Sequence, residues 1–459
     1  PKGGFDERVR QATAVLKDEA EEIASVEMLR HLIVDEVQDL VGDRAEMVLA
    51  LIERLSDGAG FTALGDPYQA LYDFQLDDSV SALGNEELLR NLVVRLGAER
   101  YHLQGDYRAL KAETRRVTKA IHEVRATDSP SRQLDLLEAL QLELPDAGAV
   151  EDVAEVLPRW TGTTALLCQT NGQAIVISKL LSEMGVANSM RRPAQELAVP
   201  AWVAGLLADA PSHQVRRDFV LEHLPTLDTQ GPTPEVAWRL LKDTERGRHR
   251  ADHLDLLVLG RRIRTGDVPA ELLESDAEDV VVSTVHRAKG LEFDNVLVMR
   301  GKPAIGDIQS TEARARELTV ALTRGRCRVC TFEAPDMQHV YLDTHCHPDR
   351  WVRGGWKRWM TTGFEVKPGD AETRFPPATS TSDAEQIQRN LTALASEQVY
   401  PVSAVLDEDQ GRDDAPIYKL VCQGMDIGIT TESFAEALGS RLDRVWRGFP
   451  AWPERLDEL

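Results

Sequence analysis

The sequence has few cysteines, no long apolar run and a deficit of positive charge. Five cysteines in 459 residues favour a reducing, cytoplasmic setting over a fold built on disulfides. No apolar run approaches the ~20 residues of a membrane-spanning helix. With 76 acidic and 53 basic residues, the formal net charge is −23. Nucleic-acid phosphates attract positive charge. The negative net charge therefore disfavours a protein whose whole surface is basic and binds nucleic acid, but it is compatible with a local basic groove.

The most informative segment is HLIVDEVQDL, residues 31–40. Its apolar residues 32–34 run directly into Asp35 and Glu36. A short apolar run that ends in acids predicts a buried parallel strand whose C-terminal end carries carboxylates into a crevice. Nucleotide-hydrolysing folds use one such carboxylate for Mg²⁺ and its neighbour to orient the attacking water. For this motif alone, a strand followed by a solvated acidic loop is an equal alternative.

Four further segments change that balance. They are FTALGDPYQALYDF at 61–74, LQGDYR at 103–108, VVSTVHRAKGLEFDNVLV at 281–298 and ELTVALTRGR at 317–326. In this order, and together with DEVQD, they resemble motifs II to VI of the UvrD/Rep family of superfamily 1 DNA helicases. TVHRAKGLEFD is the most specific of the five motifs and GDYR is the weakest, but five motifs in the correct order rarely occur by chance.

This resemblance implies a site for ATP and Mg²⁺ between two motor domains. It assigns Asp35 to Mg²⁺ and Glu36 to the role of general base. Gln69 matches the glutamine that senses the γ-phosphate, and Arg108 and Arg324 match two arginines that reach the same phosphate from the second motor domain. Planar guanidinium groups can stabilise charge as it develops on a transferring phosphoryl group. The structural alternatives are a turn amide for Gln69 and surface salt bridges for the two arginines.

The resemblance also implies the remaining nucleotide and DNA contacts. Tyr107 matches the tyrosine that stacks on adenine, and Glu292 matches the acid that binds the ribose. Gly290, grouped with the nucleotide-binding residues, shapes the motif V loop together with Lys289. Stacking on aromatic faces suits a reader of single-stranded DNA that ignores sequence, at about 1–3 kcal/mol per base. The implied DNA-binding residues are Tyr72, Phe74, Thr284 and His286, with burial in the core as the alternative for the two aromatic residues.

Helical and strand patterns alternate along the first part of the chain, which favours an α/β doubly wound parallel sheet. The resemblance implies two RecA-like motor domains, the first of them incomplete. The expected divisions are 1–100 for the C-terminal part of the first motor domain (1A), 101–187 and 276–335 for the second (2A), 188–275 for a reduced helical insertion (2B-like), 336–395 for a linker region and 396–459 for a small C-terminal α+β module.

Apolar spacing and turn residues also predict individual elements. The expected helices cover 5–29, 43–56, 82–97, 173–184, 199–208, 214–223, 235–242 and 433–446. The expected strands after residue 40 are 61–65, 163–170, 280–284, 295–299, 400–406, 417–422 and 425–430.

The sequence contains no GxxxxGK[ST]. That loop cradles the β- and γ-phosphates in the family. Since it lies far upstream of motif II there, we expect it before Pro1, in a region that this sequence does not include. The chain as written is therefore expected to bind ATP poorly and to hydrolyse little of it.

The function that the resemblance implies is ATP-driven 3′→5′ translocation on single-stranded DNA, with unwinding at duplex junctions in DNA repair or replication. A non-catalytic nucleic-acid-binding or protein-interaction scaffold that retains the motor fold is the alternative, and the missing loop fits it directly. A third hypothesis has the C-terminal module dock a protein partner. The arginines between 246 and 264 form the most basic stretch of the insertion, which is either a duplex contact or a solvated face.

The pair Cys327-x-x-Cys330, followed by His345 and His347, has spacing close to that of a zinc site. Both cysteines fall in an expected strand, where residues three apart point to opposite faces of the sheet. A structural strand is therefore favoured over a zinc site.

Overall fold

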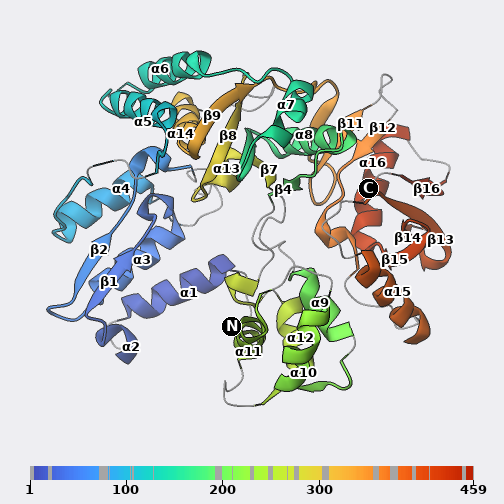
Figure 1. The fold of residues 1–459 in the computed structure, drawn as a ribbon. Coiled ribbons are helices and arrows are strands. Elements are labelled where there is room, and N and C mark those ends of the chain that lie inside the picture. The colour runs from blue at the N-terminus through green and yellow to red at the C-terminus, as the bar shows by residue number, and fades with distance from the viewer. Residues whose placement is uncertain are drawn as a thin grey trace. The chain divides into compact units, whose positions relative to one another are not determined.

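The computed structural model describes most of the chain and shows helices mixed with parallel and antiparallel strands (Figure 1). The chain divides into two compact units. Unit 1 contains Pro1–Gly148, Thr164–Gln169 and Ala288–Glu333, and unit 2 contains Ala149–Thr163, Thr170–Arg287 and Ala334–Leu459. The described residues are 5–18, 23–71, 81, 83–103, 105, 108–127, 129–191, 199–208, 210–227, 232–246, 252–265, 267–272, 279–301, 310–354, 361–372, 381–394, 400–412, 414–446 and 451–457. Along these ranges, no helix combines the length and apolar character needed to cross a membrane.

Unit 1 begins with two separate helices, α1 (Phe5–Lys17) and α2 (Ala24–Glu27). The prediction of one helix over 5–29 is therefore wrong. Ile23, at the start of α2, has φ −112° and ψ 79°, which are not helical. α1 packs against α3 (Asp43–Glu53), as the spacing over 43–56 predicts.

The first sheet of unit 1 is a parallel pair, β1 (His31–Val34) and β2 (Gly60–Ala63). Leu32 and Val34 pack into a core with α3 and with α4 (Asn85–Arg90). Because strand side chains alternate, Ile33 points to the other face, where it is 65% exposed. The predicted parallel strand is confirmed, but its predicted burial is wrong: Leu32 and Val34 are half-buried and Ile33 is exposed.

The helix expected over 82–97 forms in two parts. α4 continues into the π-helix η4 (Asn91–Arg95), which closes with a hydrogen bond of 3.0 Å from Leu96 N to Asn91 O. π-helical turns are rare. Their hydrogen bonds join residues five positions apart instead of four, so the residues that follow are shifted relative to a regular α-helix.

The second group of strands in unit 1 is parallel and buried. β3 pairs with β8, and β8 pairs with β9. Every residue of β3 is buried, which matches its continuous apolar run. Three helices lie beside these strands (Figure 1). The bounds are β3 (Thr164–Cys168), β8 (Phe293–Met299), β9 (Gly325–Phe332), α5 (Ala112–Arg125), α6 (Pro130–Glu143) and α14 (Thr311–Leu322).

Unit 2 contains a parallel pair, β4 and β7, and a helical region at the expected insertion. The insertion has its own core around Trp202, Trp238 and Leu241. Its elements are α9 (Ala201–Ala208), β5 (Gln214–Arg216), α10 (Arg217–His223), α11 (Pro234–Glu245), β6 (His253–Asp255) and α12 (Leu256–Arg264). The other elements of this part are α7 (Val150–Val156), α8 (Asn171–Glu183), β4 (Ser189–Met190), β7 (Val280–Thr284) and α13 (Val285–Ala288).

The helix predicted over 214–223 is wrong at its start. Gln214–Arg216 forms the strand β5, which pairs antiparallel with β6, and the helix begins only at Arg217. Val215 is fully buried and both of its neighbours are exposed, which is the alternation of a β-strand. Three residues are too few for this alternation to be recognised in the sequence.

Within the range expected to form a linker, 336–395, the described residues include several regular elements. Three antiparallel strands are followed by a 3₁₀ turn, η9, and the helix α15. The Pro- and Thr-rich residues 373–380 lie outside the described residues. The elements are β10 (Val340–Asp343), β11 (Arg350–Gly354), β12 (Thr361–Phe364), η9 (Pro368–Asp370) and α15 (Thr381–Leu394).

The C-terminal part is an antiparallel sheet of order β15-β14-β13-β16 with the helix α16 packed on β14. Phe434 from α16 meets Tyr418 and Phe364 edge to face. The predicted three strands and helix are confirmed, and β16 is additional. The bounds are β13 (Val402–Arg412), β14 (Ala415–Cys422), β15 (Met425–Ile429), α16 (Glu432–Trp446) and β16 (Arg455–Leu456).

Candidate functional site

The two acids of the first motif follow directly after β1. Asp35 and Glu36 are both exposed, and Asp35 Oδ1 accepts a hydrogen bond of 2.8 Å from Glu36 N. Glu36 has φ 52° and ψ 40°, a left-handed conformation that is costly for a residue with a side chain. Buried Gln38 donates from its side-chain amide to the Glu36 carboxylate. The turn therefore holds two carboxylates at the C-terminal end of a parallel strand.

A second turn lies beside the first, after β2. Gln38 Oε1 accepts a hydrogen bond of 3.0 Å from Asp66 N, so one glutamine contacts both turns. A Cβ on Gly65 would meet Gln38 Oε1 at 2.4 Å and Val37 Cγ1 at 2.7 Å, which explains the glycine. Asp66 caps the 3₁₀ turn η2 (Pro67–Gln69) by accepting from Tyr68 N at 3.1 Å.

Gln69 contacts Arg324, although 255 positions separate them in the sequence. Arg324 Nη2 donates to Gln69 Oε1 at 3.0 Å, and Gln69 Nε2 donates to Asp66 Oδ2 at 2.8 Å. Arg324 is 1% exposed and lies just after α14. Its other hydrogen bonds go to the carbonyls of Val320 and Leu291 and to the hydroxyl of Thr323. Within the described part of the chain, the four hydrogen-bond acceptors of this buried cation are neutral.

Burial lowers the pKa of the Arg324 guanidinium to about 10, and the positive charge of Arg108 contributes to the decrease. The carboxylates of Glu292, Glu36 and Asp66 act in the opposite direction. Arg324 therefore remains charged at neutral pH, and its field reaches one acid from each of the two turns.

Arg108 makes an ion pair with Glu292, with 2.6 Å between Arg108 Nε and Glu292 Oε1. Its Nη1 also donates to the backbone carbonyl of Thr323 at 3.3 Å, next to Arg324. Both partners of the ion pair are more than a third exposed. The salt-bridge alternative for Arg108 is therefore present in the structure, but its partner is itself a predicted site residue.

Lys289 joins the two turns to the motif V loop. Its ammonium group contacts the carboxylate of Asp39 and the backbone carbonyl of Gln69, and its side chain is only 4% exposed. Burial raises the pKa of Asp39 in spite of this cation. The next residue, Gly290, has φ 77°, a conformation that glycine adopts without strain.

The structure thus groups Glu36, Gln69, Arg108, Glu292 and Arg324 within unit 1. Thr284 is buried and His286 is partly buried, and both belong to unit 2. Tyr72, Phe74 and Tyr107 lie outside the described residues.

The motifs did not predict two contributors to this site, Asp39 and Arg125. Arg125 Nη2 lies 2.5 Å from Asp66 Oδ2, and the Asp39 carboxylate pairs with Lys289. Asp39 ends the VQD turn of the acidic motif, so its position in DEVQD was the available signal. Arg125 ends an amphipathic helix, where an arginine ordinarily marks a solvated face, so no sequence pattern identified it.

The two cysteines with zinc-like spacing both lie on β9, as expected. Burial raises the pKa of the Cys330 thiol to about 11, which favours the protonated thiol over the thiolate that a metal requires.

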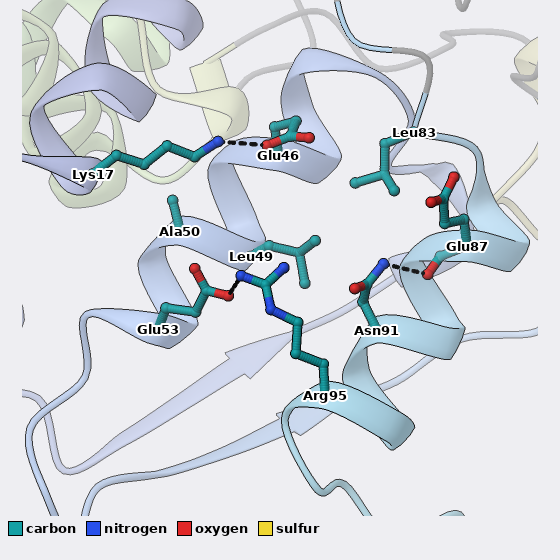
Figure 2. A pocket seen from close by; sticks show the side chains of 9 residues that line it. All are labelled: Lys17, Glu46, Leu49, Ala50, Glu53, Leu83, Glu87, Asn91 and Arg95. Atoms are coloured by element: carbon teal, nitrogen blue, oxygen red, sulfur yellow. Dashed lines mark hydrogen bonds and ion pairs between the residues drawn. The ribbon is translucent and has the colours of Figure 1, made fainter.

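A small pocket of about 190 Å³ lies elsewhere in unit 1, among α1, α3, α4 and η4 (Figure 2). Lys17 pairs with Glu46 and Arg95 pairs with Glu53 along its sides. None of the predicted site residues lines this pocket.

No family model matches this chain, and no curated protein matches it. The resemblance to the UvrD/Rep family therefore depends on the motifs and on their order in the sequence.

The donor set fits one part of an ATP·Mg²⁺ site. Asp35 and Glu36 offer the hard oxygen ligands that Mg²⁺ prefers, and Arg108 and Arg324 offer cations for phosphate oxygens. The sequence has no GxxxxGK[ST] to supply backbone N–H groups for the β-phosphate. The carboxylates and guanidinium groups are therefore of the chemical types that a phosphate and its metal would need, while the sequence as given contains no such loop.

Proposed function

We propose that this chain is most of an ATP-dependent DNA helicase of the UvrD/Rep type, which moves 3′→5′ on single-stranded DNA in repair or replication. The observation that carries the proposal is the contact of buried Arg324 with Gln69, 3.0 Å between Nη2 and Oε1. A buried cation with only neutral hydrogen-bond acceptors is suited to receive an anionic ligand. A γ-phosphate beside Gln69 is such an anion, and it would lie between the residues that the motifs assign to it.

Each residue has a defined part in this proposal. Asp35 holds Mg²⁺, and Glu36 accepts a proton from the attacking water, for which its exposed carboxylate is suited. The Gln69 amide orients that water because it has both a donor and an acceptor. Arg108 and Arg324 stabilise negative charge on the phosphoryl oxygens. ATP supplies the phosphoryl group and the free energy.

The proposal extends to the two RecA-like motor domains and to the nucleic-acid contacts. Single-stranded DNA is the partner, bound by Tyr72, Phe74, Thr284 and His286, and the insertion meets duplex junctions. Tyr107 stacks on adenine. The parallel strand pairs in both units support an α/β fold for the proposed motor.

The test is Glu36→Gln in the full-length protein. We expect DNA-stimulated ATP hydrolysis to fall by at least ~100-fold, as for other general bases, while affinity for oligo(dT) is unchanged. Glu27→Gln, at an exposed acid on α2, is the matched control. DNA-stimulated hydrolysis that survives Glu36→Gln would contradict the assignment of the base.

A non-catalytic nucleic-acid-binding scaffold is the second candidate function. The absent GxxxxGK[ST] favours it, and so does the way Arg108 and Glu292 neutralise each other. A scaffold binds oligo(dT) with the same affinity whether or not ATP and Mg²⁺ are present. A motor changes that affinity with nucleotide, which anisotropy of labelled oligo(dT) measures.

A further inference from the structure

Arg125, the last residue of α5, makes three contacts with the turn that carries Gln69. Its Nη2 lies 2.5 Å from Asp66 Oδ2. Its guanidinium lies over the Tyr68 ring, 5.2 Å from the centroid. Its backbone carbonyl accepts a hydrogen bond of 2.7 Å from the Tyr68 hydroxyl. The end of one helix and a turn 59 residues away are thus joined by charge, stacking and a hydrogen bond.

One oxygen atom links these contacts to Gln69. Asp66 Oδ2 accepts from Arg125 and also from Gln69 Nε2, the latter at 2.8 Å. With its nitrogen directed to Asp66, the amide directs Oε1 to Arg324 at 3.0 Å. The orientation of the Gln69 amide therefore depends on a carboxylate that Arg125 holds in place.

The start of the Arg125 segment is anchored next to Arg324. Leu110 N donates to the backbone carbonyl of Arg326 at 2.8 Å, and the Thr114 hydroxyl donates to the same carbonyl at 3.0 Å. Because α5 is a continuous helix of 14 residues, it spans about 21 Å and is fixed at both ends. Arg125 is thus presented to Asp66 by a rigid support.

We propose that Arg125 is a positioning residue that sets the orientation of Gln69 through Asp66. The inference rests on the proposed function, in which Gln69 orients the attacking water, and it adds a residue that no motif contains. In this proposal Arg125 acts only through Asp66 and Gln69. A planar guanidinium can pair with a carboxylate and stack on a ring at the same time, whereas the ammonium of a lysine cannot do both. Arg125→Lys should therefore retain only part of the positioning effect on Gln69.

The first experiment measures hydrogen exchange of the Tyr68 and Gln69 backbone amides in this chain. Tyr68 N donates to Asp66 Oδ1 and Gln69 N donates to Asp66 O, so both amides report on the position of Asp66. Losing one charge-assisted bond should raise their exchange about tenfold in Arg125→Gln and in Asp66→Asn. The double variant should exchange no faster than either single variant, because both break the same link.

Arg116→Gln is the matched control, since Arg116 is exposed on the same helix and the charge change is identical. It should leave exchange at Tyr68 and Gln69 unchanged. Equal exchange in Arg125→Gln and Arg116→Gln would overturn the inference. A general rise across α5 and β2 in Arg125→Gln would also overturn it, because that result indicates lost stability rather than lost positioning.

The second experiment measures steady-state ATP hydrolysis by the full-length protein. Arg125→Gln should lower kcat about tenfold and leave KM within about twofold, because Gln69 acts in the chemical step and not in ground-state binding. Arg125→Lys should recover part of kcat. An unchanged kcat, or a raised KM with unchanged kcat, would overturn the inference.

The two experiments separate the inference from the proposed function. A wild-type protein that neither binds nor hydrolyses ATP contradicts the proposed function, while the exchange result still decides whether Arg125 positions the turn. Normal hydrolysis with unchanged exchange in Arg125→Gln contradicts the inference alone.

Discussion

Two buried arginines in different regions of the molecule have opposite surroundings. Arg350, in the β10–β12 region of unit 2, is fully buried and pairs with both carboxylate oxygens of Asp370, one of them at 2.6 Å. Arg324, in the candidate site, is equally buried, yet its hydrogen-bond acceptors are three carbonyl oxygens and one hydroxyl. The first cation is neutralised within the fold. The second is left able to attract an anion, which is the property that the proposed γ-phosphate site needs.

The largest effect is expected from breaking the neutralised pair. Arg350→Met leaves Asp370 buried without its cation and should lower the free energy of unfolding of the C-terminal region by about 3–5 kcal/mol. Urea denaturation measures this change. The double variant Arg350→Met/Asp370→Leu removes both charges and should lose less than the single variant. An equal loss in both would show that the cation contributes only packing.

Arg324→Met should give the reverse pattern, a small loss of stability and a large loss of anion binding. The variant loses hydrogen bonds to neutral acceptors, which is unfavourable, but it also removes a buried charge, which is favourable. The free energy of unfolding should therefore change by less than about 2 kcal/mol. Affinity for pyrophosphate with Mg²⁺ should fall at least about tenfold. Isothermal calorimetry measures the affinity. Destabilisation as large as that of Arg350→Met would remove the contrast between the two arginines.

Titration of Arg324 gives a third test. Its pKa is lowered to about 10, so the folded chain releases this proton at a lower pH than the unfolded chain does. The buried charge disfavours folding, and this unfavourable contribution to the free energy of folding decreases as the pH rises above 10. Pyrophosphate binding should move in the other direction and weaken between about pH 8 and about pH 10.5, because a neutral guanidine attracts no anion. Arg324→Met should show no such decrease. Wild-type affinity that stays constant across this interval would contradict the assignment.

The smallest effect is expected at the exposed pair of Arg108 and Glu292, whose side chains are 36% and 39% exposed. Glu292→Gln should change the free energy of unfolding by no more than about 1 kcal/mol, because water and salt screen exposed ion pairs. Thermal denaturation at low and high salt checks this. A loss of unfolding free energy comparable with that of Arg350→Met would show that this ion pair stabilises the fold.

Much of the local structure could be predicted from sequence patterns. The long apolar spacings gave α3, β3, α8 and α16, because each of these elements buries a face that its own residues define. Gln214–Arg216 was missed because three residues cannot show a strand period without their partner β6. The burial of Ile33 was overestimated because a sequence does not state how many neighbours its strand will have.

The candidate site divides in the same way. Motif order pointed to Gln69 and Arg324, and the structure places them in contact, while their chemical roles remain predictions. Asp39 and Arg125 depend on contacts with residues 250 and 59 positions away, and no local spacing encodes such contacts. These long-range charge pairs can therefore be recognised only in the three-dimensional structure.

The side chain of Gln38 has a consequence for any attempt to retune this site. Its amide nitrogen contacts Glu36 and its amide oxygen accepts from Asp66 N, so the length of one residue fixes the gap between the acids and the second turn. Glutamate at this position would set a negative charge against Glu36, and asparagine would be one methylene too short to reach both partners. The spacing between Glu36 and Asp66 is therefore governed by an uncharged side chain that is only 1% exposed.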